Sequence, residues 1–163
     1  MYEVNTQTTD PRQIYQEHVD FLSDSLLAND FEGFASRISF PHHIQNVNAA
    51  FVSENLADLR RLFDQMHESL VLDRVTTIVR FCTQASFVQT DEIVGEHVSE
   101  ILRGATRAVR PYRNRLRLIR SRDGVWRETN SANAISVKSG QMGLYTQSDQ
   151  EEQVPDFGRH HKD

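Results

Sequence analysis

The chain has 163 residues and a formal net charge of −5 at pH 7, which suits one globular domain. The mild negative charge argues against nucleic acid as a partner. No apolar run approaches the roughly 20 residues of a membrane span, and the first twenty residues lack the apolar core of a signal peptide. The single cysteine, Cys82, excludes an internal disulfide, so we expect a cytoplasmic protein.

Two helices are predicted near the start of the chain. Residues 1–10 show no periodicity and are predicted to be a flexible N-terminus, although Asp10 followed by Pro11 indicates a helix start. The stripe of this helix repeats every 3.6 residues and consists of Ile14, Tyr15, His18, Phe21, Leu22, Ser25 and Leu26. Asp30 is predicted to cap a short second helix that runs through Ile38.

Two short strands and a third helix are predicted next. Pro41 cannot continue a helix, so residues 42–47 are expected to be extended and residues 50–52 to form the returning strand. Ser53 is predicted to cap the third helix. The apolar stripe of that helix consists of Leu56, Leu59, Leu62, Phe63, Met66 and Leu70.

From Arg74 the hydrophobic pattern changes to a period of two, which predicts a long strand with one buried face. The buried face is predicted to hold Val75, Thr77, Val79, Phe81, Thr83, Ala85 and Phe87. The solvent face is predicted to hold Thr76, Arg80, Gln84 and Ser86. In this interpretation Phe81 packs against the apolar stripes of the first and third helices.

Further strands are predicted after this one. Residues 93–109 suit either a helix or a strand, and we predict a strand because Gly95 and Gly104 disfavour a helix. Pro111 opens the next strand, and Asp123-Gly124 predicts a tight hairpin.

The returning strand is predicted to run from Val125 to about Val137, which would complete a domain over residues 11–138. Residues 139–163 are dominated by Gly, Gln, Ser and acids, which predicts a polar C-terminal tail. We expect this tail to pack back onto the domain at Leu144, Tyr145 or Phe157.

Arginines are concentrated in residues 103–127, where nine of them accompany one acid, Asp123. The simplest interpretation is the solvated face of long strands, where long side chains cover apolar surface. A subunit interface that pairs the arginines with acids, and a site for an anionic ligand or nucleic acid, are the alternatives.

The predicted order is helix, short helix, short hairpin, helix and four long antiparallel strands. In this order the chain resembles the nuclear transport factor 2-like superfamily, also called cystatin-like or SnoaL-like, over about residues 11–138. The segments that carry the resemblance are Asn29-Asp30-Phe31, Ser39-Phe40-Pro41, Leu56 to Phe63 and Arg122 to Arg127. The resemblance implies an α+β fold in which N-terminal helices pack in a cone on a strongly bent antiparallel sheet.

The resemblance also implies a pocket at the open end of the cone and a dimer through the outer sheet face. Members include ketosteroid isomerases, scytalone dehydratase, polyketide cyclases, dioxygenase small subunits and binding proteins, so the fold implies a pocket and not one reaction. Tyr15 lies about where the tyrosine of ketosteroid isomerases lies, but the early strand, residues 42–46, lacks their aspartate base. By residue type, the His and Tyr chemistry of scytalone dehydratase is the nearest match.

His18 and Tyr15 are the candidate catalytic residues, because His18 places a titratable ring in the middle of an apolar helix stripe. The alternative is a structural histidine that bonds to Ser25 or to a backbone carbonyl. The predicted pocket lining consists of His42, His43, His97, Phe21 and Phe81. Because His42 and His43 point to opposite faces of their strand, at most one of them enters the pocket.

No metal site or cofactor is predicted, because HxH, HExxH and paired-cysteine spacings and a Gly-rich phosphate loop are all missing from the sequence. Three functions remain open. The first is a small enzyme that uses His/Tyr acid–base chemistry on an apolar carbonyl substrate. The others are a non-catalytic ligand-binding or dimerisation module and a small accessory subunit of an oxygenase. The expected partners are a small apolar ligand and a second copy of the chain.

Overall fold

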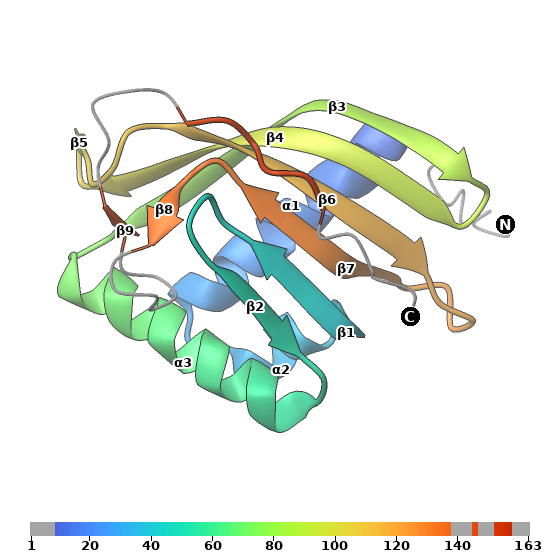
Figure 1. Ribbon diagram of the computed structural model, residues 1–163, viewed down its shortest axis with the longest axis horizontal. Coiled ribbons are helices and arrows are strands. Elements are labelled where there is room, and N and C mark those ends of the chain that lie inside the picture. Colours follow the sequence, from blue (N-terminus) through green and yellow to red (C-terminus); the bar gives the residue numbers. More distant parts are fainter. Residues whose placement is uncertain (1–8, 138–144, 147–151, 158–163) are drawn as a thin grey trace, which may run out of the picture.

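The computed structural model describes residues 9–137, 145–146 and 152–157 (Figure 1). Its helices are α1 (Pro11–Leu27), α2 (Phe31–Ala35) and α3 (Leu56–Leu72). The main sheet consists of β1 (Ile38–Gln45), β2 (Ala50–Ser53), β3 (Thr77–Gln89), β4 (Glu92–Arg103), β5 (Thr106–Arg107), β6 (Tyr112–Arg120) and β7 (Trp126–Asn133). A small second sheet pairs β8 (Ser136–Val137) with β9 (Tyr145–Thr146). In the described part of the chain, every helix is too short or too polar to cross a membrane.

The strands of the main sheet follow the order β2-β1-β7-β6-β4-β3, and β5 pairs with β4. Figure 1 shows this sheet bending around the helices, with α1 behind the long strands and α3 below β1 and β2. The predicted α+β fold, with N-terminal helices packed on a strongly bent sheet, is confirmed. The sheet is antiparallel as predicted except between β1 and β7, which run parallel.

Capping side chains define where the helices begin. Asp10 caps α1 as predicted, since its carboxylate accepts a hydrogen bond from the Arg12 backbone N–H at 2.9 Å. α3 is capped by Asn55 and not by the predicted Ser53, because Ser53 still belongs to β2. The second helix is shorter than predicted, because Ile38 is already paired in the sheet as the first residue of β1.

The predicted faces of β3 are reversed only in the first part of the strand. Phe81 is 56% exposed, whereas Ile78 and Arg80 face the interior. A register shift between Cys82 and Gln84 exchanges the faces again, so Phe87 pairs with the buried Ile93 on the inward face, as predicted. An alternating pattern defines two faces of a strand, and a shift of one residue exchanges them. On β3 both faces carry apolar side chains, so the alternation alone could not identify the buried one.

Gln16 of α1 fixes how this helix sits against β3. Its Nε2 donates to the Arg80 carbonyl oxygen at 2.6 Å, and its Oε1 accepts from the Cys82 backbone N–H at 2.8 Å. β3 is the last strand of the sheet, so the Gln16 amide occupies backbone groups that would otherwise lack a strand partner. α1 is thereby held over the inward face of β3, and Phe81 is left outside.

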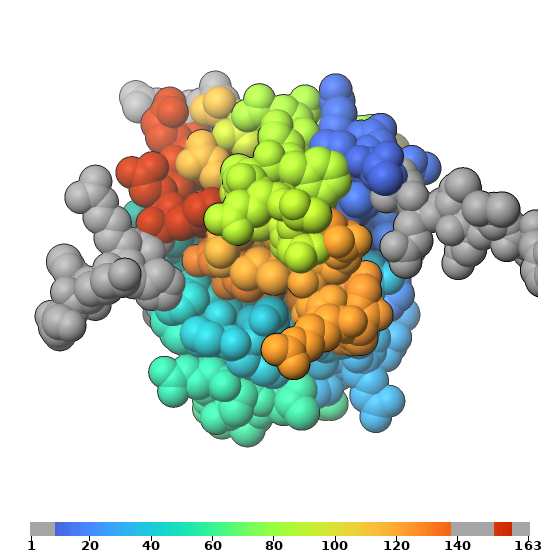
Figure 2. Space-filling view, turned by 90° about the vertical axis from the view of Figure 1, so that its right-hand side faces the viewer, coloured from blue at the N-terminus to red at the C-terminus, as the bar shows by residue number. Residues whose placement is uncertain are grey.

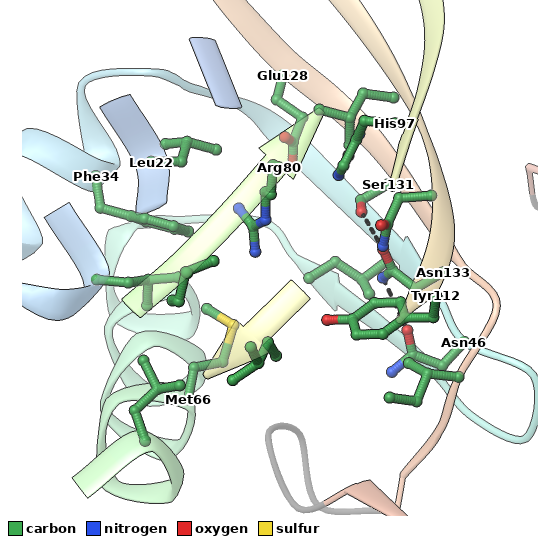
Figure 3. Close-up of a pocket in the computed structure, with 18 of the residues that line it drawn as sticks. Leu22, Phe34, Asn46, Met66, Arg80, His97, Tyr112, Glu128, Ser131 and Asn133 are labelled. Carbon is green, nitrogen blue, oxygen red and sulfur yellow. Dashed lines mark hydrogen bonds between the residues drawn. The ribbon is translucent and has the colours of Figure 1, made fainter. Parts of the chain in front are cut away.

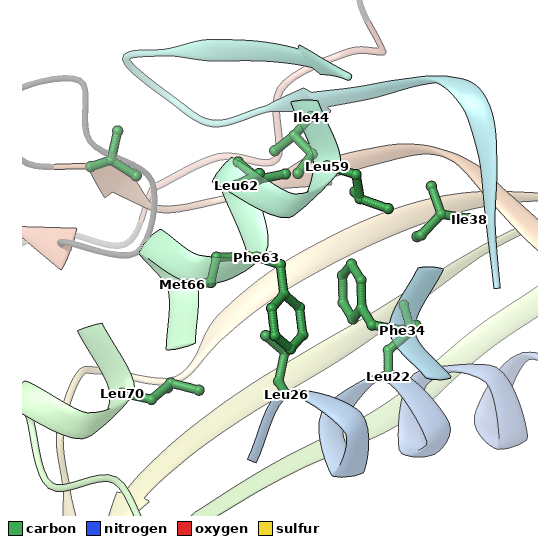
Figure 4. Packing of buried hydrophobic residues seen from close by; sticks show 11 residues of the cluster. Leu22, Leu26, Phe34, Ile38, Ile44, Leu59, Leu62, Phe63, Met66 and Leu70 are labelled. Atoms are coloured by element: carbon green, nitrogen blue, oxygen red, sulfur yellow. The ribbon is translucent and has the colours of Figure 1, made fainter. Parts of the chain in front are cut away.

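Three apolar clusters of described residues surround the interior, and α1 contributes to two of them. The larger one lies between the helices and β1 (Figure 4), and its buried members are Leu22, Leu26, Phe34, Ile38, Ile44, Leu59, Leu62, Phe63, Met66, Leu70 and Val137. Phe63 of α3 is fully buried and contacts Phe34 of α2, with ring centroids 5.3 Å apart. The second cluster joins Tyr15 and Val19 of α1 to Ile93 in the middle of the sheet. α1 therefore takes part in both clusters.

The outer face of the sheet carries arginines that pair with acids on neighbouring strands. Arg117 binds Glu92 at 2.6 Å and Arg115 binds Glu96 at 2.9 Å, in both cases between β6 and β4. Pairs near the surface each contribute about 0–1 kcal/mol, so they affect strand pairing more than total stability. These contacts agree with the interpretation of the arginines as residues of a strand face.

Most of the predicted tail, residues 139–163, lies outside the described residues, and Leu144 lies there too. Tyr145 belongs to β9, whose backbone pairs with Val137 of β8. The Phe157 ring lies beside the sheet, with its centroid 5.9 Å from the Arg115 guanidinium. The described pieces of the tail therefore pack back onto the domain.

The hairpin between β6 and β7 has the predicted turn. Gly124 has a φ of +81°, a region that glycine enters without strain. The Ser121 N–H donates to the Val125 carbonyl and the Gly124 N–H donates to the Ser121 carbonyl, each at 2.9 Å. A Cβ added to Gly124 would meet no heavy atom within 4 Å, so only the backbone conformation restricts this position.

Replacing Gly124 by Val should lower the free energy of unfolding by about 1–2 kcal/mol, because a positive φ strains an L residue, and a β-branched one most. Gly124→Asn is the matched control, since asparagine tolerates this conformation and should cause a smaller loss. Urea unfolding followed by circular dichroism measures both variants. Equal stability of the Val variant and the wild type would contradict this turn.

Candidate functional site

A cavity of about 70 Å³ lies between the helices and the concave face of the sheet (Figure 3). Its apolar lining consists of Leu22, Leu26, Phe34, Ile44, Met66, Leu70, Ile78, Ile101, Leu116 and Ile135. Its polar lining consists of His42, Asn46, Arg80, His97, Tyr112, Asn114, Glu128, Ser131 and Asn133. The three helices contribute apolar side chains only, so the polar groups all come from the strands and the end of β1.

Glu128 of β7 is buried between two histidines. His42 Nε2 of β1 lies 2.6 Å from one carboxylate oxygen, Oε2, and His18 Nε2 of α1 lies 3.2 Å from the other, Oε1. Glu128 is 5% exposed, and both rings are buried. An unpaired carboxylate in such a place would cost several kcal/mol, so the two histidines are the partners that allow its burial.

The charge of Glu128 follows from these contacts. Burial by itself raises its pKa, but the hydrogen bonds from His18 and His42 outweigh this effect and hold the pKa below its usual range. Glu128 is therefore ionised at neutral pH and accepts an Nε2–H from each ring. The Nδ1 atoms of both rings have no hydrogen-bond partner among the described residues. His42 lines the cavity and His18 does not, so His42 is the histidine of this trio that lies beside a ligand in the cavity.

Tyr15 and His97 form a second buried pair, with 2.6 Å between Tyr15 Oη and His97 Nδ1. Burial raises the pKa of Tyr15 well above its ordinary value, so the phenol keeps its proton. Burial, together with the charge of Arg80, lowers the pKa of His97 well below its ordinary value, so this imidazole is neutral. Tyr15 then donates to Nδ1, and His97 carries its own proton on Nε2. Since His97 lines the cavity, it supplies an N–H donor there.

Gly95 of β4 provides the space for this pair. A Cβ at that position would lie 2.6 Å from the Tyr15 ring and 2.8 Å from the backbone oxygen of Gln84. The second of these contacts involves backbone, which cannot move aside easily. Glycine therefore allows the Tyr15 ring to lie directly against the sheet within reach of His97.

Asparagine side chains form a hydrogen-bonded row along the sheet side of the cavity (Figure 3). The Ser99 hydroxyl donates to Asn114 Oδ1 at 2.7 Å, and Asn114 Nδ2 donates to Asn133 Oδ1 at 2.6 Å. Asn133 Nδ2 in turn donates to Asn46 Oδ1 at 2.9 Å. Each amide both donates and accepts, so this row can bind either kind of polar group on a ligand.

Known proteins match this chain in structure and not in sequence: no family model and no curated protein matches it. A cystatin-like domain of unknown function from Nostoc punctiforme has a TM-score of 0.63 at 14% identity, covering 82% of each chain. A nuclear transport factor 2-like protein from Novosphingobium aromaticivorans has a TM-score of 0.57 at 21% identity, covering 76% of this chain and 80% of that one.

A ketosteroid isomerase-like protein from Erwinia carotovora atroseptica has a TM-score of 0.54 at 12% identity, covering 77% of this chain and 96% of that one. This chain has the nuclear transport factor 2-like, cystatin-like fold. Identities this low define the fold and leave the reaction open. The chemistry of this site therefore depends on its own side chains.

Four of the residues proposed from the sequence come together at the cavity. Tyr15, His18, His42 and His97 are all buried, and two of them, His42 and His97, line it directly. His43 does not line the cavity, because successive residues of β1 point to opposite faces. In the described part of the chain, no group of three or more His, Cys, Asp and Glu side chains is arranged to hold a metal ion.

The two phenylalanines predicted to line the pocket do not reach it. Phe21 lies at the edge of the α1 stripe, beside the larger apolar cluster, where the Arg37 guanidinium covers its ring at 4.2 Å. Phe81 projects from the outer face of β3. The prediction for Phe81 was wrong because the two faces of β3 were exchanged, and for Phe21 because the stripe of α1 is wider than the cavity.

No sequence signal indicated Glu128, although it is the partner of both His18 and His42. It lies in the polar run from Arg127 to Asn130, where no apolar alternation marks a buried position. The predicted structural partner of His18 was Ser25 or a carbonyl, but the Ser25 hydroxyl donates to the Phe21 carbonyl oxygen at 2.9 Å.

Replacing Glu128 by Gln should destabilise the protein at pH 7 by about 3–5 kcal/mol, because two buried histidines lose their carboxylate. A carboxyl whose pKa is lowered by folding stabilises the folded protein at pH values above its ordinary pKa. This stabilisation is lost as the pH falls toward the folded-state pKa. Below the ordinary pKa of 4.5 the wild type should therefore lose stability more steeply than the variant.

Denaturant unfolding at a series of pH values measures both effects. Glu96→Gln on the outer face is the control, and it should change stability by less than about 1 kcal/mol, because its ion pair is partly exposed. Parallel pH profiles of the wild type and Glu128→Gln below pH 4.5 would show that folding does not lower the pKa of Glu128.

Proposed function

We propose that the protein binds a small, largely apolar carbonyl compound in its cavity and transfers protons to and from it through His42. The observation that carries this proposal is the 2.6 Å hydrogen bond between His42 Nε2 and Glu128 Oε2 in the wall of the cavity. A carboxylate that holds one imidazole nitrogen fixes the tautomer and stabilises the imidazolium that forms when the other nitrogen accepts a proton.

In the proposed reaction, Nδ1 of His42 removes a proton from the carbon next to the carbonyl group. The electron pair of the broken C–H bond moves toward the carbonyl oxygen, which becomes an enolate oxygen. The Nε2–H of His97 and the asparagine row supply donors for that charge. Return of the proton to another carbon isomerises the compound, and its delivery to a leaving hydroxyl dehydrates it. Isomerases and a dehydratase are both among the members of the superfamily that the chain resembles.

The fold supports this class without identifying the compound. The ketosteroid isomerase-like protein from Erwinia has the same fold, and the present chain has two histidines in its cavity wall, one of them hydrogen-bonded to the buried Tyr15. His42 and His97 are the proposed catalytic residues, whereas Glu128, His18 and Tyr15 act through them.

A non-catalytic ligand-binding module, or a small accessory subunit of an oxygenase, is the second candidate. The cavity of about 70 Å³ is well below the roughly 300–1,000 Å³ of typical ligand pockets, so any ligand is small under either candidate. The observation that favours the second candidate is that Glu128, Tyr15 and the asparagines already have hydrogen-bond partners within the protein. Such a network can stabilise a fold without performing a reaction.

Exchange of the carbon-bound protons of cyclohexanone in D₂O, followed by proton NMR, distinguishes the two candidates. The wild type should accelerate exchange at the carbons next to the carbonyl, and His42→Gln should lower the accelerated rate about 10²–10⁴-fold. His43→Gln is the matched control, one residue further along β1, and should keep the wild-type rate.

A wild type that binds cyclohexanone, seen as a rise in Tm, without accelerating exchange would favour the binding module. Equal rates for His42→Gln and His43→Gln would remove His42 from the proposed chemistry. Thermal unfolding of each variant shows whether a lost rate reflects a lost fold.

We also propose that the chain forms a homodimer through the outer face of the sheet. In support, Phe81 of β3 is 56% exposed on that face, beside the half-buried Val98 with which it pairs. An isologous contact would bury these apolar side chains on both copies. Arg80, which was expected on this face, lies inside the domain instead.

Sedimentation velocity at micromolar concentration tests the dimer. The wild type should sediment with about twice the chain mass of 18.8 kDa, and Phe81→Asp should sediment as a monomer, because an aspartate cannot be buried without a partner. Leu72→Asp changes another exposed apolar residue, on α3, and should leave the dimer intact. A wild type of 18.8 kDa would contradict the proposal.

A further inference from the structure

Arg80 is the cationic side chain of the cavity lining. It projects from the inward face of β3 into the space between the sheet residues His97 and Asn133 and the helix residues Leu22 and Met66 (Figure 3). Its backbone is fixed, because the Arg80 carbonyl oxygen accepts the hydrogen bond from Gln16 at 2.6 Å. The guanidinium is therefore held at the cavity by an anchored strand and not by a loop.

The Arg80 side chain has no acidic partner within the described residues. Its Nε is buried without a hydrogen-bond acceptor, and none of the ion pairs found in that part of the chain includes it. The arginines of the outer face differ, since Arg115 and Arg117 bind Glu96 and Glu92. A cation that lies at a cavity without an ion-pair partner is costly, so an anion in the cavity would be bound favourably.

The one carboxylate of the cavity lining does not fill this role. Both oxygens of Glu128 are already occupied by His18 and His42. Its negative charge nevertheless limits what else the cavity can accept. A monoanion and Arg80 form a neutral pair beside Glu128, whereas a dianion such as a phosphate monoester keeps a surplus negative charge that Glu128 repels.

We infer that the ligand of this cavity is a small carboxylic acid with an apolar body, whose carboxylate is bound by the Arg80 guanidinium. The inference rests on the proposed function, because it concerns the same cavity and names the class of compound that enters it. The guanidinium fork matches the two oxygens of a carboxylate. The apolar body would lie against Leu22, Met66 and Ile101. For a substrate, the carbonyl and the carboxylate belong to one molecule, a small oxo acid.

Binding of acids and their neutral analogues tests this inference without any variant. Acetate, isobutyrate and cyclohexanecarboxylate are titrated by calorimetry beside acetamide, isobutyramide and cyclohexanecarboxamide. At least one acid should bind the wild type about tenfold or more tighter than its amide, since hydrogen bonds to charged groups add about 1.5–3 kcal/mol. Equal binding of every acid and its amide, or no binding of any acid, would overturn the inference.

Variants of Arg80 then locate the effect. Arg80→Met keeps an unbranched side chain of similar length and should abolish the preference for the acid while leaving amide binding unchanged. Arg120→Met, which removes an arginine paired with Asp91 on the outside, should keep the preference. An acid preference that survives in Arg80→Met would also overturn the inference. Because Arg80→Met removes a buried cation, its Tm without ligand should be no lower than that of the wild type.

The two proposals fail in different ways. If exchange of cyclohexanone protons depends on His42 but acids bind no better than amides, the proton chemistry stands and the anion site does not. If acids are preferred through Arg80 but no exchange occurs, the cavity is a carboxylate-binding site without the proposed reaction.

Discussion

The burial of one carboxylate organises the interior of this protein. Glu128 belongs to the last long strand, whereas its partners belong to the first helix and the first strand, so the trio joins the two ends of the domain. A buried carboxylate requires cationic or hydrogen-bond-donating partners. Here the two imidazoles supply one partner for each carboxylate oxygen. The docking of α1, the parallel pairing of β1 with β7 and the position of the cavity all meet at this point.

Polar groups are confined to one side of the interior. The helices present apolar side chains to the cavity, while the sheet side presents Glu128, His42, His97 and the asparagine row. Within each group the members satisfy one another, which allows them to be buried beside an otherwise apolar core. This separation gives a bound molecule a polar face and an apolar face to match, as both candidate functions require.

The arginines show how the direction of a strand residue decides its role. Arg115 and Arg117 project outward and pair with acids of β4, where they support the sheet. Arg80 projects inward, at the cavity, and forms no ion pair with any of the described residues. One residue type thus serves as a strand-face ion pair in one place and as a candidate ligand contact in another. The difference follows from the side of the sheet on which the residue lies.

The sequence alone determined the elements that depend on local chemistry. Caps, helical periodicity and the Asp123-Gly124 turn involve residues close in the chain, so the order of elements and the α+β fold followed from the pattern. Tyr15 and His18 could also be placed on the inward stripe of α1, because helical spacing defines one face. The partners of these residues, in contrast, are distant in sequence.

Only the tertiary structure decided which side chains meet. Glu128 lies 110 residues from His18 and in a polar run, so no local signal connects the two. The burial of Arg80 in place of Phe81 depends on how α1 docks on the edge of β3, and an alternating strand is equally compatible with both choices. Local pattern defines elements and their faces, whereas the pairing of buried charges is set by packing across the whole chain.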